Sequence, residues 1–109
     1  MKKTLLAVAS ALSVAFAGPA EAQNRSDVYR MGYFLLGTYL RASVVCDNKS
    51  LAEYGFSFVG SKEFRAFSTA YPQTYKKWMT EGGENFNSLV MRDGIPDACK
   101  FVVSRMTRG

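Results

Sequence analysis

The sequence predicts an all-α fold, a small bundle of five or six short helices stapled by one disulfide, after a cleaved signal peptide. Three observations support this prediction. Apolar residues recur at helical spacing through most of the chain after residue 22. Capping residues, glycines and prolines divide that part into short segments. Two cysteines are present, and they allow a single intramolecular pair. We expect residues 23–109 to form one helical domain.

The N-terminus has the parts of a secretory signal peptide. Lys2 and Lys3 supply positive charge, residues 5–17 are an uncharged apolar run, and Ala20-Glu21-Ala22 has small residues at the two positions that a signal peptidase reads. The run is too short to span a bilayer as a helix, which needs about 20 residues. We therefore expect residues 1–22 to be cleaved and the mature chain to be periplasmic, without a transmembrane segment.

The first predicted helix begins near Ser26, a good N-cap, and ends at Asp47-Asn48, which leaves Cys46 on its last turn. Gly32 and Gly37 weaken this helix by about 1 kcal/mol each relative to alanine, and we expect them to allow close packing by a neighbouring helix. Its apolar stripe consists of Val28, Met31, Leu35, Ala42 and Val45, with Tyr39 close to the same face.

The next two helices are predicted from their caps. Ser50-Leu51-Ala52-Glu53 has the form of a capping box, so a second helix is expected to begin at Leu51. Residues 56–59 also fit a strand, but a lone strand has no partner to pair with, so we favour helix. Ser61 is the expected cap of a third helix, which Pro72 ends because the residue before a proline avoids helical geometry.

Glycine and proline divide the C-terminal third of the chain. Pro72 is tolerated in the first turn of a fourth helix, and we expect Gly82-Gly83 to break that helix. A short fifth segment around Phe86 ends at Asp93-Gly94. The last helix is expected to start at Pro96, with Arg105 and Arg108 near its negative end. Its buried stripe is predicted to consist of Cys99, Val102, Val103 and Met106.

Cys46 and Cys99 are predicted to form a structural disulfide, because an exported chain meets an oxidising environment. Closing a loop of about 54 residues stabilises a fold by about 4 kcal/mol on the chain-entropy model. A redox-active pair is the alternative. We disfavour it because these cysteines lack the Cys-x-x-Cys spacing of oxidoreductases.

Charge narrows the classes of partner. Removing Lys2, Lys3 and Glu21 from the 14 basic and 9 acidic side chains leaves 12 and 8, a net charge of +4. This mild excess favours an acidic protein partner and permits weak affinity for anionic surfaces. Gly94-Ile95-Pro96-Asp97 faintly resembles the phosphate-binding hairpin of some DNA-binding modules, but Pro96 has no N–H to donate. We expect no nucleic acid partner.

The residue types also argue against an enzyme. The chain has no histidine, which excludes Ser-His and Cys-His pairs and histidine metal sites. Once both cysteines are bridged, no thiolate is left to bind zinc. The carboxylates stand mostly at predicted helix starts and turns, where capping accounts for them. We expect no catalytic residue, no metal and no cofactor.

Aromatic residues are unusually dense between Tyr54 and Phe86, where basic residues are interleaved with them. Most of these rings are expected to fill a small core. Their number exceeds what one small core easily hides, and tyrosine, tryptophan and arginine are favoured at protein interfaces. A short amphipathic helix that binds lipid weakly is the alternative. The residues that we predict to form an interaction surface are Tyr71, Tyr75, Lys76, Lys77 and Trp78.

In outline, the chain resembles two groups of exported helical proteins with one disulfide. These are the immunity proteins that block toxins injected between bacteria and the acid-activated periplasmic chaperones. The first resemblance implies a non-catalytic binding protein of inhibitor or immunity type, which contacts another exported or envelope protein. The second implies a fold that opens in acid. A third hypothesis is an accessory subunit or a module that binds an envelope polymer. We favour the first.

Overall fold

The structure, a computed structural model, describes residues 17–108 of the chain, and the all-α prediction is confirmed for this part. Residues 1–16, which make up most of the expected signal peptide, lie outside the described residues. Between residues 17 and 108, no helix combines the length and the apolar character needed to cross a membrane. The five helices are α2 (Ala17–Val45), α3 (Lys49–Ser57), α4 (Lys62–Ala70), α5 (Pro72–Asp93) and α6 (Ile95–Arg108).

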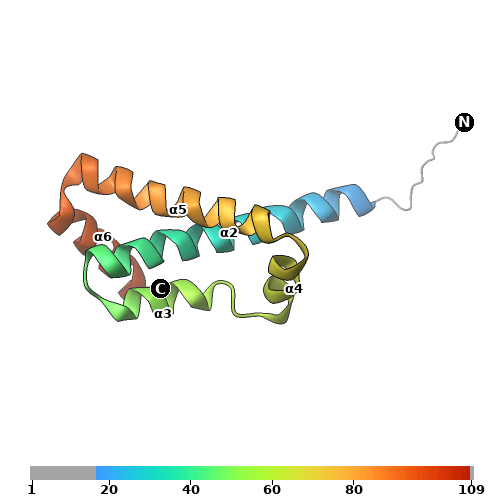
Figure 1. Cartoon of the computed structure of the whole chain (residues 1–109), viewed down its shortest axis with the longest axis horizontal. Helices are drawn as coiled ribbons and strands as arrows, with labels where there is room; N and C mark the ends of the chain where they lie inside the picture. The colour runs from blue at the N-terminus through green and yellow to red at the C-terminus, as the bar shows by residue number, and fades with distance from the viewer. Residues whose placement is uncertain (1–16, 109) are drawn as a thin grey trace, which may run out of the picture.

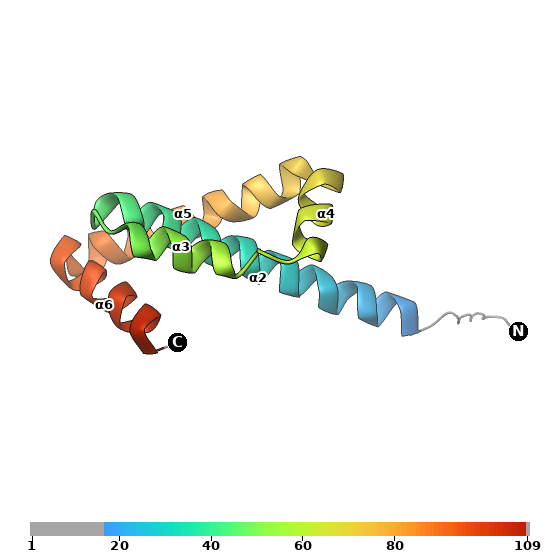
Figure 2. The same ribbon diagram turned by 90° about the horizontal axis from the view of Figure 1, so that it is seen from below.

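The long helix α2 is the centre of the bundle, with α5 along one side and α3 along the other (Figure 1). Helix α5 runs parallel to α2, because Gly37 approaches Met79 and the ring of Tyr33 lies 5.1 Å from that of Tyr75. The short α4 turns the chain at one end, and α6 closes the other end. The N-terminal part of α2 extends beyond the other helices (Figure 2).

Two predicted helix starts are wrong. Helix α2 begins at Ala17 instead of near Ser26, because the alanine-rich stretch before Ser26 favours helix and proline is tolerated in a first turn. Helix α3 begins at Lys49 instead of Leu51, because the side chain of Asn48 accepts a hydrogen bond from the backbone N–H of Ser50 at 3.0 Å. Asn48 is therefore the N-cap of α3.

Two other predicted boundaries are confirmed. Ser61 is the N-cap of α4, and its hydroxyl accepts a hydrogen bond from the N–H of Phe64 at 3.4 Å. Pro72 is in the first turn of α5, directly after Tyr71. The chain therefore turns sharply between α4 and α5 at the place where the proline was expected to end one helix and start another.

The predicted break at Gly82-Gly83 is also wrong, because α5 is one continuous helix of 22 residues. A Cβ atom at Gly82 would overlap the backbone of Phe34, and one at Gly37 would overlap the backbone of Met79. The two glycines let α2 and α5 pack backbone to backbone. This packing outweighs the helix propensity lost at each glycine, about 1 kcal/mol. The expectation that Gly37 allows close packing is confirmed.

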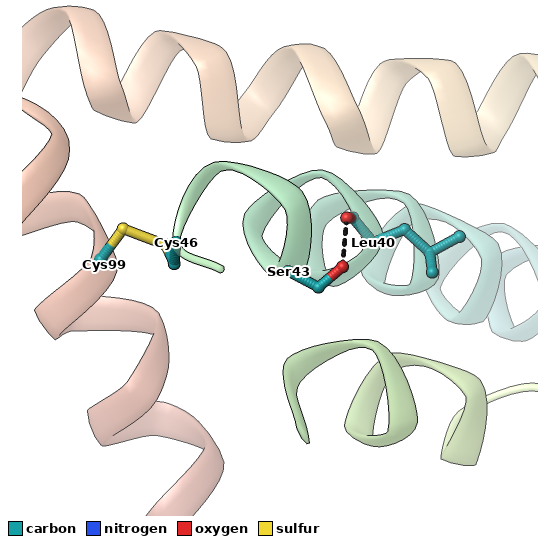
Figure 3. The surroundings of a disulfide bond; sticks show 4 residues. All are labelled: Leu40, Ser43, Cys46 and Cys99. Atoms are coloured by element: carbon teal, nitrogen blue, oxygen red, sulfur yellow. Dashed lines mark hydrogen bonds between the residues drawn. A yellow bond between two sulfur atoms is a disulfide. The ribbon is translucent and has the colours of Figure 1, made fainter. Parts of the chain in front are cut away.

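The core lies where α2, α3, α5 and α6 meet, and the predicted disulfide between Cys46 and Cys99 closes it. The Cα atoms of the two cysteines lie 5.7 Å apart, and the bond ties the end of α2 to α6 (Figure 3). The partly buried side chains of both cysteines pack against the core. The buried residues of this cluster are Tyr39, Ala42, Leu51, Phe86, Ala98 and Val102.

The predicted apolar stripe of α2 is buried at its C-terminal end only. Ala42 is fully buried, whereas Val28 is 59% exposed and Met31 is 58% exposed. Helix α6 reaches only the C-terminal part of α2 (Figure 2). The middle of α2 buries Tyr33 and Leu36, which lie outside this stripe. An apolar face of α2 is thus left uncovered.

Candidate functional site

The five residues predicted to form an interaction surface lie together at the start of α5, where α4 meets it. We call them the Tyr71–Trp78 patch. Tyr71 joins the two helices and is 56% exposed, and Lys76 and Lys77 are exposed. Tyr75 and Trp78 are half-buried. The structure therefore separates the patch into two rings that pack inward and three side chains that face solvent.

The aromatic ring of Phe67 in α4 is the centre of the packing where α4 meets α5. Trp78 stacks on Phe67 with 5.5 Å between the ring centroids, and Tyr71 lies 5.0 Å from the same ring. Tyr29 of α2 also stacks on Phe67, at 4.6 Å. Aromatic pairs of this kind add about 0.5–1.5 kcal/mol each beyond the apolar area that they bury. The patch is consequently held on a packed aromatic cluster.

The same cluster is fixed to the long helix by Tyr33. Its hydroxyl donates a hydrogen bond to the carbonyl of Phe64, and its ring packs at 5.1 Å on Tyr75. Burial raises the pKa of Tyr33 above its usual value of 10.0, which further favours the neutral phenol that donates this bond. This bond ties α4 to α2 and fixes the support beneath the patch.

A second surface, a groove between α2, α3 and α6, was not predicted from the sequence. Its volume is about 350 Å³. Arg105 and Arg108 were assigned to the negative end of the last helix, and the structure places both on one wall of this groove. The spacing of residues within α6 does not predict that these arginines line a groove, because their position depends on the angle at which α6 crosses α2. The floor consists of Leu35, Tyr39, Tyr54 and Phe58.

The positive charge of Arg105 affects the pKa of Tyr39 on the floor of the groove. Burial raises the pKa of Tyr39, Tyr54 adds to this effect, and the positive charge of Arg105 opposes it. The guanidinium group of Arg105 therefore acts on the phenol of Tyr39 through space. The groove combines an aromatic floor with positive charge on one wall, which suits an occupant that is apolar and carries a negative group.

An adjoining hollow of about 390 Å³ continues the groove toward the N-terminal end of α2. The two hollows share Leu35 and Phe58, so they form one continuous surface, which we call the α2 groove. This second half is almost entirely apolar, apart from Asp27 at its end. Its remaining lining residues are Val28, Met31, Gly32 and Phe64.

Reactive groups are few in this structure. Both cysteines are bridged to each other, and the chain has no histidine. Within residues 17–108, no group of three or more Cys, Asp or Glu side chains lies close enough together to hold a metal ion. The two surfaces described above are apolar or aromatic with charged rims, and such surfaces recognise ligands by shape and charge.

Comparison with known proteins adds no family. The chain matches no protein-family model, no curated protein and no solved structure.

Proposed function

We propose that the protein is a non-catalytic exported binding protein, which acts in the periplasm by direct contact with another exported or envelope protein, in the manner of an inhibitor or immunity protein. The observation that carries this proposal is the exposed side chain of Tyr71, which the exposed Lys76 and Lys77 follow within two turns of α5, on a corner that is fixed by packed rings. Exposed aromatic and basic residues on a rigid support are typical of the anchors of protein interfaces.

Rigidity matters for affinity because binding costs free energy for every side chain that it orders, about 0.5–1.5 kcal/mol each. The Trp78 ring is already held by Phe67, and the Tyr75 ring by Tyr33. A partner that docks here has to order the exposed side chains of Tyr71, Lys76 and Lys77, but not the rings beneath them. Tyr71 offers an aromatic side chain to an apolar pocket, and the two lysines select a partner surface that is acidic around that pocket.

The test is affinity capture at two pH values. The chain is expressed with its own leader, purified in the oxidised form and used as bait against periplasmic extract at neutral pH and near pH 2.5. We expect one dominant partner at neutral pH, in stoichiometric amount. Many substoichiometric proteins held only in acid would instead make the protein an acid-stress chaperone, and would contradict this proposal.

The salt dependence separates a protein partner from an envelope polymer. Exposed charges are screened beyond about 8–10 Å at physiological ionic strength, so a complex held by Lys76 and Lys77 alone is lost at high salt. A partner that docks on the aromatic side chains as well is retained, although more weakly. Complete release at high salt, together with binding to purified anionic polymer, would support an envelope-binding module or accessory subunit and contradict the inhibitor type.

A further inference from the structure

The α2 groove leaves an apolar face without a covering helix. Val28, Met31 and Leu35 follow one another at helical spacing on α2, and the first two are more than half exposed. Helix α6 has 14 residues and is therefore about 21 Å long, whereas residues 23–45 of α2, which follow the expected leader, span about 35 Å. Among residues 17–108, a helix covers one end of this face and none covers the other.

The two ends of the groove carry opposite charge. Arg105 and Arg108 line the end where Tyr39 lies. Asp27 lines the other end, and Glu63 borders the adjoining hollow beside Val28. Asp27 and Tyr39 are 12 positions apart on α2, which corresponds to about 18 Å along the helix axis. The groove therefore has a positive end and a negative end, with the apolar floor between them.

This arrangement is complementary to itself. A two-fold axis through the middle of the groove, level with Tyr33, brings the arginine end of one copy onto the Asp27 end of the other and the reverse. It also brings the α6 end of one copy over the exposed apolar end of α2 in the other. Such reciprocal contacts are the property of an isologous dimer interface, in which one surface serves both subunits.

We propose that the occupant of the α2 groove is a second copy of this chain, arranged antiparallel in a two-fold dimer. Each α2 groove then receives the C-terminal end of the other copy's α6, which covers Val28 and Met31. A small molecule is a poorer occupant, because Val28 and Met31 are 59% and 58% exposed on an open surface, whereas ligand pockets are concave and bury about 70% or more of a ligand. The Tyr71–Trp78 patch shares no residue with the groove, so the dimer leaves the patch free for another protein.

The first test is the molar mass of the oxidised protein in solution. The full chain is produced with its own leader, and its mass is followed by sedimentation equilibrium as the protein concentration rises. We expect twice the chain mass at low ionic strength, and Met31→Glu is expected to abolish the dimer. Lys100→Glu is the matched control, because Lys100 is exposed on α6 and does not line the groove. A monomer at every concentration would overturn the proposal.

The second test asks whether charge fixes the arrangement. Arg105→Glu and Asp27→Lys are each expected to weaken the dimer, and the chain that carries both is expected to regain it, because the reversed charges again face each other. Far-UV circular dichroism confirms that each variant is folded. A dimer indifferent to both single variants, or no recovery in the double variant, would contradict the antiparallel arrangement. Affinity capture tests the Tyr71–Trp78 patch, whereas the dimer tests concern the α2 groove. A failed dimer test would therefore not contradict the proposed function, and a failed capture would not contradict the dimer.

Discussion

Gly82 of α5 lies so close to the carbonyl group of Phe34 in α2 that no side chain fits between them. The hydroxyl of Thr38, which is buried at this crossing, lies 3.0 Å from the carbonyl oxygens of both Phe34 and Gly82. The crossing thus combines direct backbone packing with a satisfied buried polar group. It fixes how α5 lies on α2, and with it the position of the Tyr71–Trp78 patch.

The adjacent glycines of α5 are predicted to respond to alanine in opposite directions. Gly82→Ala forces α2 and α5 apart, and we expect it to lower the free energy of unfolding by about 2–3 kcal/mol, as overpacking does. At Gly83 an added Cβ would have only ordinary contacts, with the nearest atoms 3.8 Å away. Gly83→Ala is therefore expected to stabilise the helix by up to about 1 kcal/mol. Urea unfolding of both variants checks this, and equal effects would contradict the account of the crossing.

The disulfide is predicted to supply a large share of the stability. It closes the chain over 53 positions, and we expect Cys46→Ser/Cys99→Ser to lower the free energy of unfolding by about 4 kcal/mol. Replacing both cysteines avoids leaving a free thiol. The far-UV helix signal at low temperature is expected to stay recognisable. Equal unfolding midpoints for the oxidised and reduced wild-type protein would contradict this prediction.

Stability is predicted to fall in alkali because burial raises the pKa of Tyr33 and Tyr39, and Tyr39 is the residue chosen for the test. Burial favours the neutral phenol and raises its pKa in the folded chain above the unfolded value of 10.0. The resulting contribution to stability is complete below pH 10 and is lost as the pH rises through the folded pKa. Tyr39→Phe removes this contribution, and urea unfolding between pH 8 and about 11 measures it. Tyr71→Phe, which removes an exposed phenol, is the control. An unchanged pH slope in Tyr39→Phe would contradict the prediction.

The aromatic residues of the patch are predicted to differ in their effect on stability. Trp78 is half-buried and stacks on Phe67, so we expect Trp78→Ala to lower the free energy of unfolding by about 1–3 kcal/mol, less than for a fully buried tryptophan. Tyr71 is mostly exposed, and Tyr71→Ser is expected to stay within about 0.5 kcal/mol of wild type. Thermal melts of the two variants decide this. A larger loss from Tyr71→Ser would show that Tyr71 supports the fold.

The local features of the fold could be predicted from the sequence, and the helix crossings could not. Ser61 and Pro72 fix helix boundaries through their own backbone and side-chain chemistry, so the pattern was sufficient there. The sequence predicts a break at Gly82-Gly83, because low helix propensity is visible in it whereas the backbone of Phe34 against Gly82 is not. Tertiary packing decided that position.

The same limit applies to the two surfaces. The Tyr71–Trp78 patch could be predicted because its residues are close in the sequence. Only the structure shows which of its rings pack inward and which side chains are exposed. The α2 groove joins residues of four segments of the chain. Val28 and Met31 were recognised as part of an apolar stripe, but that pattern does not tell whether another helix covers them. Arg105 comes to the groove only through the path of α6.

Parallel affinity capture with wild type and a variant of the patch shows whether the protein binds its partner through this surface. Tyr71→Ser/Lys76→Ser/Lys77→Ser removes the three exposed side chains of the patch and keeps the packed rings. Met91→Ser is the control, because Met91 is 88% exposed at the other end of α5. We expect the neutral-pH partner to be retained by wild type and Met91→Ser and lost from the triple variant. Equal recovery of the partner by all three baits would contradict a function that acts through this patch.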